Sequence, residues 1–389
     1  MRKTALLLLG LVVMGIVALG LLILSSASAA NASRLHGGDV YFFLKRQSIY
    51  IVAGVVVAVC VALFDYRRWR ECEVLTWSFF VIVAMLLVGV LFTRAINGSH
   101  RWFSVGPISL QPSEFAKIAI VIALSVWFDK LGWRVELFTR GALMPFLLIC
   151  VLAIPVMREP DFGSTLVIFM SGVLVMLLAG VRIMHLLPFV LMGGAVIVVK
   201  IMTNANRMAR LAAWFGVHAG SSPAVMTAKT AAAGANYQAY NALVAIGNGG
   251  IWGVGLGESM QKHFYLPEAH TDFIFAVGAE ELGLFFSIGA ILLFCLFYGT
   301  SLYIARKASD RFGRYIVVGM ASLIFAQAMV NVGVVCSAFP TKGLALPFFS
   351  YGGTNMISAF FAVGMIFSVG VHALRDKRAA FARKVLMRS

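Results

Sequence analysis

Ten separate apolar runs, each close to the length that crosses a bilayer, constrain the fold of this 389-residue chain more than any other feature. A membrane-spanning helix needs about 20 apolar residues. The chain is 61% hydrophobic and 12% charged, with a mean hydropathy of +0.91, which excludes a soluble globular domain. We expect an all-α polytopic membrane protein with spans at 5–27, 48–64, 75–92, 115–128, 141–157, 163–180, 184–202, 272–303, 315–338 and 355–374.

The distribution of basic residues predicts how these spans are oriented. Cytoplasmic connectors are rich in Lys and Arg. Placing both termini inside puts more than half of the 32 Lys and Arg residues in cytoplasmic segments, and this also explains the net charge of +16 without nucleic-acid binding. The first run resembles a signal peptide, but its apolar core is longer than such regions usually have, which favours a retained helix.

The domain organisation is simple. No internal repeat or linker divides the chain, so we expect a single membrane domain over residues 1–389, with a long extracytoplasmic loop at 203–271. Three segments mix Gly, Pro, aromatic and charged residues, and all three lie outside in this topology: 94–114, 203–271 and 339–354. An activity on the outer face follows.

The segment LPEAHTDFIFAVGAEELG, residues 266–283, places three carboxylates at the start of an apolar span. Asp272 opens that span, with Thr271 as a possible cap, and either caps its own helix or serves as a base. Glu280 and Glu281 lie about two turns into the span, where an unpaired charge costs several kcal/mol, so they need partners or water. Helical spacing keeps both glutamates from sharing the face of Asp272, which indicates that one is structural. Both Glu280 and Glu281 are nevertheless candidate substrate-binding residues that would support a hydrophilic cavity.

Basic residues at the outer ends of the spans predict an anion site. Glu114 and Lys117 are three residues apart on one helical face, which is either a local ion pair or part of a larger site. In the second case Lys117 joins a cationic pocket suited to a pyrophosphate. Its other members would be Arg101, Arg158, Arg207, Arg210 and Lys342.

Other motifs carry weaker signals. The turn REPDFGST, residues 158–165, consists of ordinary turn formers. The Gly-rich run 245–259 follows no strand and does not match GxGxxG, so it indicates close backbone approach or a hinge rather than a nucleotide site. The histidines lack the spacing of a zinc site, and no serine-hydrolase motif is present. We therefore predict no bound metal among the site residues.

Four long motifs resemble the SEDS (shape, elongation, division and sporulation) proteins, the polytopic peptidoglycan polymerases of bacteria. They are NGSHRWFSVGPISLQPSEFAK, EPDFGST, AIGNGGIWGVGLGESMQKHFYLPEAHTDFIFAVGAEELG and PTKGLALPFFSYGG, in the family's order over nearly the whole chain. The third and fourth are more similar to the division branch of the family than to its elongation branch. Ser337 departs from the pattern, since the family usually has a glycine there.

The resemblance implies a function and its residues. It implies that Asp272 is the family's essential aspartate and that Glu114 and Lys117 line a central cavity. The implied substrate is lipid II, growing on an undecaprenyl-linked glycan. The implied partners are a class B penicillin-binding protein and other divisome proteins, at the division septum of the bacterial inner membrane.

The chemistry of this reaction fits the residues. Joining a sugar pyrophosphate to a sugar hydroxyl with inversion needs a base for the hydroxyl and positive charge for the departing pyrophosphate. Asp272 is the candidate base. The sequence leaves open whether a divalent cation such as Mg²⁺ takes part.

Three other functions are compatible with the sequence. A transporter of lipid II would also contain buried charges, but these should then continue into the inner half of the bundle. A divisome scaffold without activity would not need Asp272. An elongation-type polymerase would share the chemistry but not the place of action.

Overall fold

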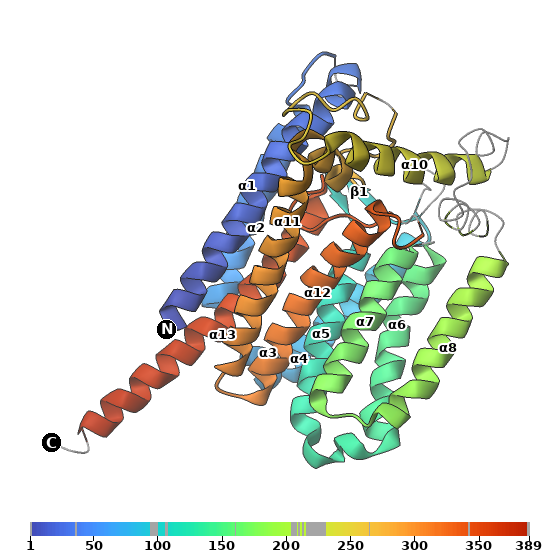
Figure 1. Cartoon of the computed structure of the whole chain (residues 1–389). Helices are drawn as coiled ribbons and strands as arrows, with labels where there is room; N and C mark the ends of the chain where they lie inside the picture. Colours follow the sequence, from blue (N-terminus) through green and yellow to red (C-terminus); the bar gives the residue numbers. More distant parts are fainter. Residues whose placement is uncertain are drawn as a thin grey trace.

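The computed structural model describes residues 2–35, 37–93, 100–105, 108–159, 161–203, 208, 211, 214, 231–263, 265–340 and 343–386. Over these residues the chain forms a bundle of long helices with a small hairpin at one end (Figure 1). The elements are α1 (Arg2–Leu35), α2 (Phe42–Leu63), α3 (Arg68–Glu71), α4 (Glu73–Val90), β1 (Phe103–Val105), β2 (Ile108–Leu110), α5 (Pro112–Leu131), the 3₁₀ turn η1 (Gly132–Glu136), the π turn η2 (Phe138–Leu143), α6 (Met144–Arg158), α7 (Phe162–Ala179), α8 (Ile183–Met202), α10 (Ala231–Gly249), α11 (Ile274–Arg306), α12 (Arg311–Val335) and α13 (Gly353–Leu386).

Each of the ten predicted spans coincides with a helix, and the all-α membrane fold is confirmed. Eight helical segments among the described residues are long and apolar enough to cross a membrane. The other two predicted spans are α5 and α8. Helix α5 carries the charged residues Glu114 and Lys117, and the apolar stretch of α8 is shorter, Ile183–Val196. Ten spans and their orientation therefore stay a prediction.

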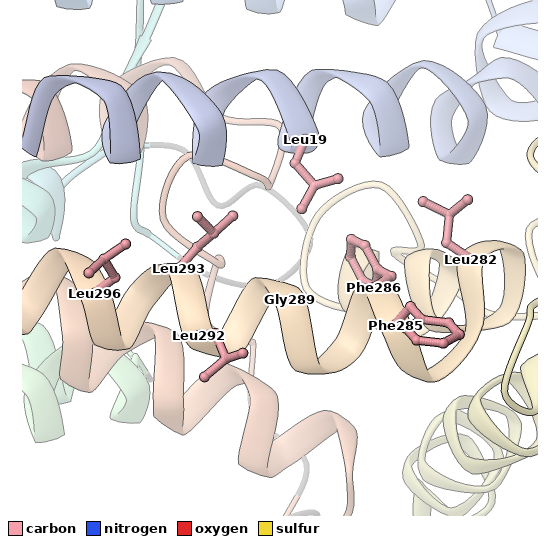
Figure 2. Close-up of a pocket in the computed structure, with 8 residues that line it drawn as sticks. All are labelled: Leu19, Leu282, Phe285, Phe286, Gly289, Leu292, Leu293 and Leu296. Atoms are coloured by element: carbon pink, nitrogen blue, oxygen red, sulfur yellow. The ribbon is translucent and has the colours of Figure 1, made fainter. Parts of the chain in front are cut away.

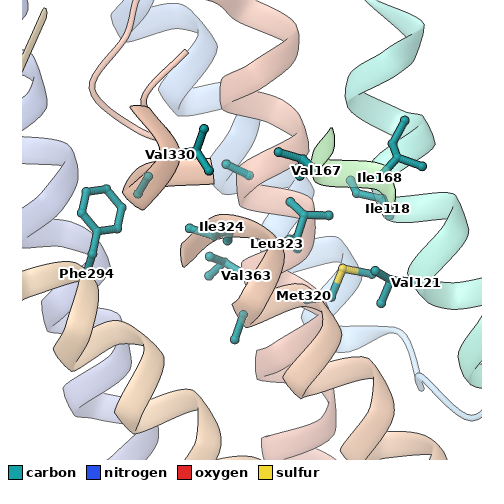
Figure 3. Close-up of a cluster of buried hydrophobic side chains, with 14 of the residues drawn as sticks. Ile118, Val121, Val167, Ile168, Phe294, Met320, Leu323, Ile324, Val330 and Val363 are labelled. Atoms are coloured by element: carbon teal, nitrogen blue, oxygen red, sulfur yellow. The ribbon is translucent and has the colours of Figure 1, made fainter. Parts of the chain in front are cut away.

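Helix α5 lies in the core of the bundle although it is one of the more polar helices. Nearly all of its residues from Pro112 to Val126 are buried. Figure 3 shows Ile118 and Val121 of α5 among side chains of α7 and α12. A Cβ at Gly319 of α12 would lie 2.4 Å from Val121, so this glycine lets the two helices approach closely. Small residues commonly permit such packing inside membranes.

The end of the bundle opposite the two chain termini is called here the loop end (Figure 1). It contains the described parts of the three unusual segments. The hairpin pairs Phe103 with Leu110 and Val105 with Ile108 in antiparallel register. Helix α10 lies across this end, so the predicted loop 203–271 contains a helix of its own (Figure 1).

The start of α11 differs from the prediction. The helix begins at Ile274 with Phe273 as its N-cap, so Asp272 precedes the helix instead of opening it. Thr271 does not cap α11, because its hydroxyl bonds to the backbone and side chain of Glu268. The helical spacing used to place the two glutamates relative to Asp272 consequently does not apply.

Helix α11 is interrupted at Gly283, whose φ of 67° and ψ of −155° are not helical. The Gly-rich run packs on this kink. A Cβ at Gly249 would lie 2.0 Å from the carbonyl oxygen of Ala279, and one at Gly253 would lie 2.2 Å from that of Glu281. Only glycine permits this contact, so the predicted close backbone approach is confirmed.

Ser337, the departure from the family pattern, has a φ of 58°. This left-handed conformation is open to glycine without steric cost and is unfavourable for serine. The backbone geometry at this position therefore favours glycine over the serine that this chain has.

Candidate active site

Asp272 lies at the loop end, directly before α11, and is partly exposed. The side chain of Asn331, on α12, fixes the backbone around it. Its Nδ2 donates to the carbonyl oxygen of Asp272 at 2.9 Å and to that of Leu344 at 2.6 Å. One buried amide thus ties the candidate base to the segment that follows α12.

The segment 343–351 runs alongside residues 270–272 and is held there by further hydrogen bonds. Ser350 Oγ donates to the carbonyl oxygen of Thr271 at 2.6 Å and accepts from the backbone N–H of Leu346 at 2.7 Å. The N–H of Tyr351 donates to the carbonyl oxygen of His270 at 3.0 Å. Since Ser350 is fully buried, water competes little for these bonds, and the position of Asp272 is well defined.

Two glycines, Gly163 and Gly343, place the EPDFGST motif at the start of α7 next to the segment beside Asp272. A Cβ added at Gly343 would lie 2.7 Å from Asp272 Oδ2, and one added at Gly163, on α7, would lie 3.2 Å from the carbonyl oxygen of Gly343. The motifs around Asp272, Gly163 and Gly343 are far apart in the sequence. Gly343 contacts the carboxylate of Asp272, and Gly163 contacts the backbone of Gly343, so the three motifs meet beside the candidate base.

The turn between α6 and α7 carries two buried carboxyl groups. Asp161 caps α7 by accepting from the N–H of Ser164 at 3.0 Å, and its other oxygen accepts from Gln111 Nε2 at 3.3 Å. Glu159 is fully buried, and neither of its carboxyl oxygens has a hydrogen-bond partner in the described part of the chain. Burial and the nearby charge of Asp161 raise the pKa of Glu159 to about 8, and Arg101 opposes this shift.

Lys117 is fully buried and joins a polar network that reaches the segment beside Asp272. Its Nζ donates to Glu114 Oε1 and to Gln327 Oε1, both at 2.8 Å. Gln327 in turn donates to the carbonyl oxygen of Ala345 at 2.9 Å, and Ser358 donates to Glu114 at 3.1 Å. The predicted ion pair is therefore present, and it connects α5, α12 and α13 to the segment beside Asp272.

Glu280 and Glu281 have partners, as expected of carboxylates inside a membrane span. Glu280 accepts from the hydroxyl of Ser259. Glu281 accepts from Ser26 Oγ of α1 at 2.5 Å and forms an ion pair with Lys262 at 3.0 Å. Both glutamates therefore anchor the segment 257–262 to α11, and their contact with substrate stays a prediction.

The predicted cationic pocket is only partly described by the structure. Arg101 donates through Nε to the carbonyl oxygen of Glu159 at 2.9 Å, which places it beside the turn between α6 and α7. Arg158 ends α6 and is exposed. Arg207, Arg210 and Lys342 lie outside the described residues.

No group of three or more His, Cys, Asp or Glu side chains among the described residues is arranged to hold a metal ion. Mg²⁺ is commonly bound by one or two carboxylates together with substrate phosphates, a mode that needs no such cluster.

An apolar pocket between α1 and α11 is separate from this polar site. It has a volume of about 590 Å³, and its lining is entirely apolar. Figure 2 shows it between α1 and α11, with Leu19 on one side and Leu293 on the other. Such a lining suits hydrocarbon and contributes no group to the chemistry of sugars or phosphates.

Sequence reasoning missed several polar residues that build this site. Gln327 and Asn331 are amides four residues apart in an apolar helix, and this spacing could have marked them as neighbours on one face. Glu159 was interpreted as part of an ordinary turn. Its burial depends on how α6 and α7 pack, which the sequence does not reveal.

The fold and the site together define a polytopic membrane protein whose polar groups converge at one end of a helix bundle. Residues 6–374 match the family of cell cycle proteins designated FTSW_RODA_SPOVE. The chain belongs to this family, so the resemblance found in the sequence is confirmed, and the chain is a multi-pass bacterial membrane protein.

Similar proteins are found in several bacteria. A probable peptidoglycan glycosyltransferase FtsW of Trichlorobacter lovleyi is 35% identical over 347 residues, which covers 89% of this chain and 87% of the relative. A protein of the same designation from Coxiella burnetii is 35% identical over 352 residues, 89% of this chain and 90% of the relative. The stage V sporulation protein E of Bacillus subtilis is 34% identical over 338 residues, 85% of this chain and 87% of the relative.

Solved structures share the fold. The rod shape determining protein RodA of Thermus thermophilus matches with a TM-score of 0.64 at 26% identity, over 93% of this chain and 95% of that one. A chain from a peptidoglycan synthase complex matches with a TM-score of 0.73 at 24% identity, over 94% of this chain and 97% of that one. The second likeness concerns the fold alone.

Proposed function

We propose that this protein is a peptidoglycan glycosyltransferase that polymerises lipid II on the outer face of the bacterial inner membrane, with Asp272 as general base. One observation carries the proposal. The partly exposed carboxylate of Asp272 lies against Gly343, which in turn packs on Gly163 of α7. Asn331 fixes the backbone of Asp272. The FtsW designation of the relatives supports a role in division rather than elongation.

The proposed reaction uses Asp272 to take the proton from the attacking sugar hydroxyl. That oxygen forms the new glycosidic bond as the bond from the anomeric carbon to the pyrophosphate breaks, with inversion. The polyprenyl pyrophosphate leaves with its electron pair. A base contributes when it lies within hydrogen-bond reach of the proton that it removes, and the hydrogen bonds of segment 343–351 hold Asp272 for this purpose.

The leaving pyrophosphate requires positive charge. We propose Arg101 as its described ligand, since it is anchored at the loop end through the carbonyl oxygen of Glu159. Arg158 is exposed at the same turn and is a second candidate. Arg207, Arg210 and Lys342 keep this role as sequence-based proposals.

Lys117 and Glu114 are proposed to support the substrate site from below. Lys117 is fully buried and paired, so a substrate cannot reach it in this arrangement. Its bond to Gln327 instead helps to position the backbone at Ala345 beside Asp272. Glu280 and Glu281 are proposed to stabilise the outer segment 257–262 over the site.

The proposed partners are a class B penicillin-binding protein, which would cross-link the glycan, and other divisome proteins at the septum. Lipid II and the undecaprenyl-linked glycan would reach the site from the bilayer, because both keep their lipid tails there. A site at the membrane interface fits such substrates.

The experiment that tests this function compares polymerisation with transport. Purified protein in liposomes, with and without a class B penicillin-binding protein, is given fluorescent lipid II, and glycan length and transbilayer movement are both measured. We expect glycan strands that require Asp272, with no faster movement than in empty liposomes. Movement of lipid II without glycan synthesis would contradict the proposal and support a transporter.

A further inference from the structure

Glu159 is a buried ionisable group that the proposed reaction does not use. Its side chain is fully buried, and neither carboxyl oxygen has a hydrogen-bond partner in the described structure. A buried carboxylate without partners is costly, so such a group is retained as the neutral acid. An unpartnered acid beside a proposed pyrophosphate ligand requires an explanation.

The same residue holds Arg101. The guanidinium of Arg101 donates through Nε to the backbone carbonyl oxygen of Glu159 at 2.9 Å, while the carboxyl group of Glu159 accepts no hydrogen bond. Arg101 is therefore positioned by the backbone carbonyl of Glu159 and not by its carboxyl group. Protonation of the Glu159 carboxyl group then sets the net charge of the Arg101–Glu159 pair, which is positive for the neutral acid and close to zero for the carboxylate.

Among the described residues, the charged groups that shift the pKa of Glu159 are Asp161 and Arg101. Asp161, the N-cap of α7, adds negative charge, and Arg158, its neighbour on α6, is exposed. Glu114 and Lys117 of α5 are paired with each other. The segment 343–352 carries no charged side chain. Arg101 is thus the described cation that acts on Glu159, and it opposes the effects of burial and of Asp161.

We propose that Glu159 is a positioning residue that sets the affinity of Arg101 for the substrate pyrophosphate through its own protonation. The neutral acid adds no negative charge beside Arg101, so the pyrophosphate binds. The carboxylate acts as a competing counter-ion and weakens binding. This inference rests on the proposed function, because it assigns the pyrophosphate of lipid II to Arg101.

The direction of the pH effect follows from the position of the titration. Glu159 has its pKa raised to about 8, so it is mostly neutral near pH 7 and ionises over the next two pH units. The apparent KM for lipid II should therefore rise as the pH increases. Since Arg101 is also the proposed ligand of the departing pyrophosphate, kcat should fall over the same pH range.

The test measures KM and kcat for lipid II polymerisation between about pH 6.5 and about pH 9.5 in the wild type, in Glu159→Gln and in Glu258→Gln. Glu258 is an exposed glutamate in the loop-end segment that precedes α11 and serves as the matched control. We expect KM to rise about tenfold over this range in the wild type and in Glu258→Gln, and to stay nearly constant in Glu159→Gln. An alkaline rise in Glu159→Gln equal to that of the wild type would overturn the proposal.

A second variant covers the case in which Glu159→Gln does not fold. Arg101→Gln removes the group through which Glu159 is proposed to act, so the alkaline rise in KM should disappear, and its persistence would overturn the proposal. Failure of the proposed function itself would look different. The wild type would then make no glycan at any pH.

Discussion

Gly343 lies directly against the carboxylate of Asp272, so that a Cβ at residue 343 would come within 2.7 Å of Asp272 Oδ2. The same glycine presents its carbonyl oxygen to Gly163 on α7. No side chain fits at this position without moving the proposed base. This contact offers a way to displace Asp272 without replacing it.

Gly343→Ala should lower the rate of lipid II polymerisation by about 100-fold while changing the free energy of unfolding by less than about 1 kcal/mol. The added methyl group meets the end of a flexible side chain, which can move, and Gly343 does not have a positive φ. Activity and thermal unfolding in detergent check both parts.

The control for this variant is Gly352→Ala in the same segment. A Cβ at Gly352 would meet only the Cβ of Asn355, at 3.7 Å, which is an ordinary contact. This control should retain wild-type activity. Equal activity of Gly343→Ala and Gly352→Ala would show that the position of Asp272 is not critical.

Lys117→Met should destabilise the protein by about 3–5 kcal/mol, because it leaves the buried carboxylate of Glu114 without its cation. The double variant Lys117→Met with Glu114→Gln should recover most of this loss, since no buried charge remains. Denaturant unfolding in micelles measures both. A double variant as unstable as the single one would contradict the assignment of Lys117 as a charge partner.

Lys262→Met should loosen the loop-end segment 257–262 that Glu281 anchors to α11. The amides of Val254 and Gly255 donate to the carbonyl oxygens of Glu280 and Glu281, at 3.0 Å each, so they report on this contact. We expect their hydrogen exchange to accelerate about tenfold. Unchanged exchange of these amides would show that the ion pair does not hold the segment.

The free energy of unfolding of the wild type should fall as the pH rises, and Glu159→Gln should remove this fall. The pKa of Glu159 is raised from 4.5 to about 8 in the folded protein, so between these values the unfolded chain releases a proton that the folded chain retains. Wild-type stability is therefore complete below about pH 4.5 and decreases as the pH approaches 8. Thermal unfolding across this range should show a flatter profile for Glu159→Gln, and identical profiles would contradict the burial of an acid.

Much of the fold could be predicted from the sequence because long apolar runs specify membrane helices locally. All ten predicted spans are helical, including α5, whose Glu114 and Lys117 obscured its apolar character. The kink at Gly283 was not predicted. It depends on backbone contacts with the glycine-rich segment, which come from another part of the chain.

The candidate site was predicted less completely, since its contacts join distant residues. Asp272 could be found because a carboxylate beside an apolar span is unusual. The partner of Glu281 on α1, Ser26, is 255 residues away in the sequence, and nothing distinguishes it from the neighbouring serines Ser25 and Ser28. Glu159 looked like an ordinary turn residue because its burial arises only from packing of the bundle.

The measurement that tests the central claim most directly is the rate of lipid II polymerisation by purified Asp272→Asn. Asparagine has nearly the same shape as aspartate but cannot accept the proton of the attacking hydroxyl. If Asp272 is the general base, the folded variant should bind lipid II with wild-type affinity and polymerise it about 10²–10⁴-fold more slowly. A folded Asp272→Asn that makes glycan at the wild-type rate would contradict the account.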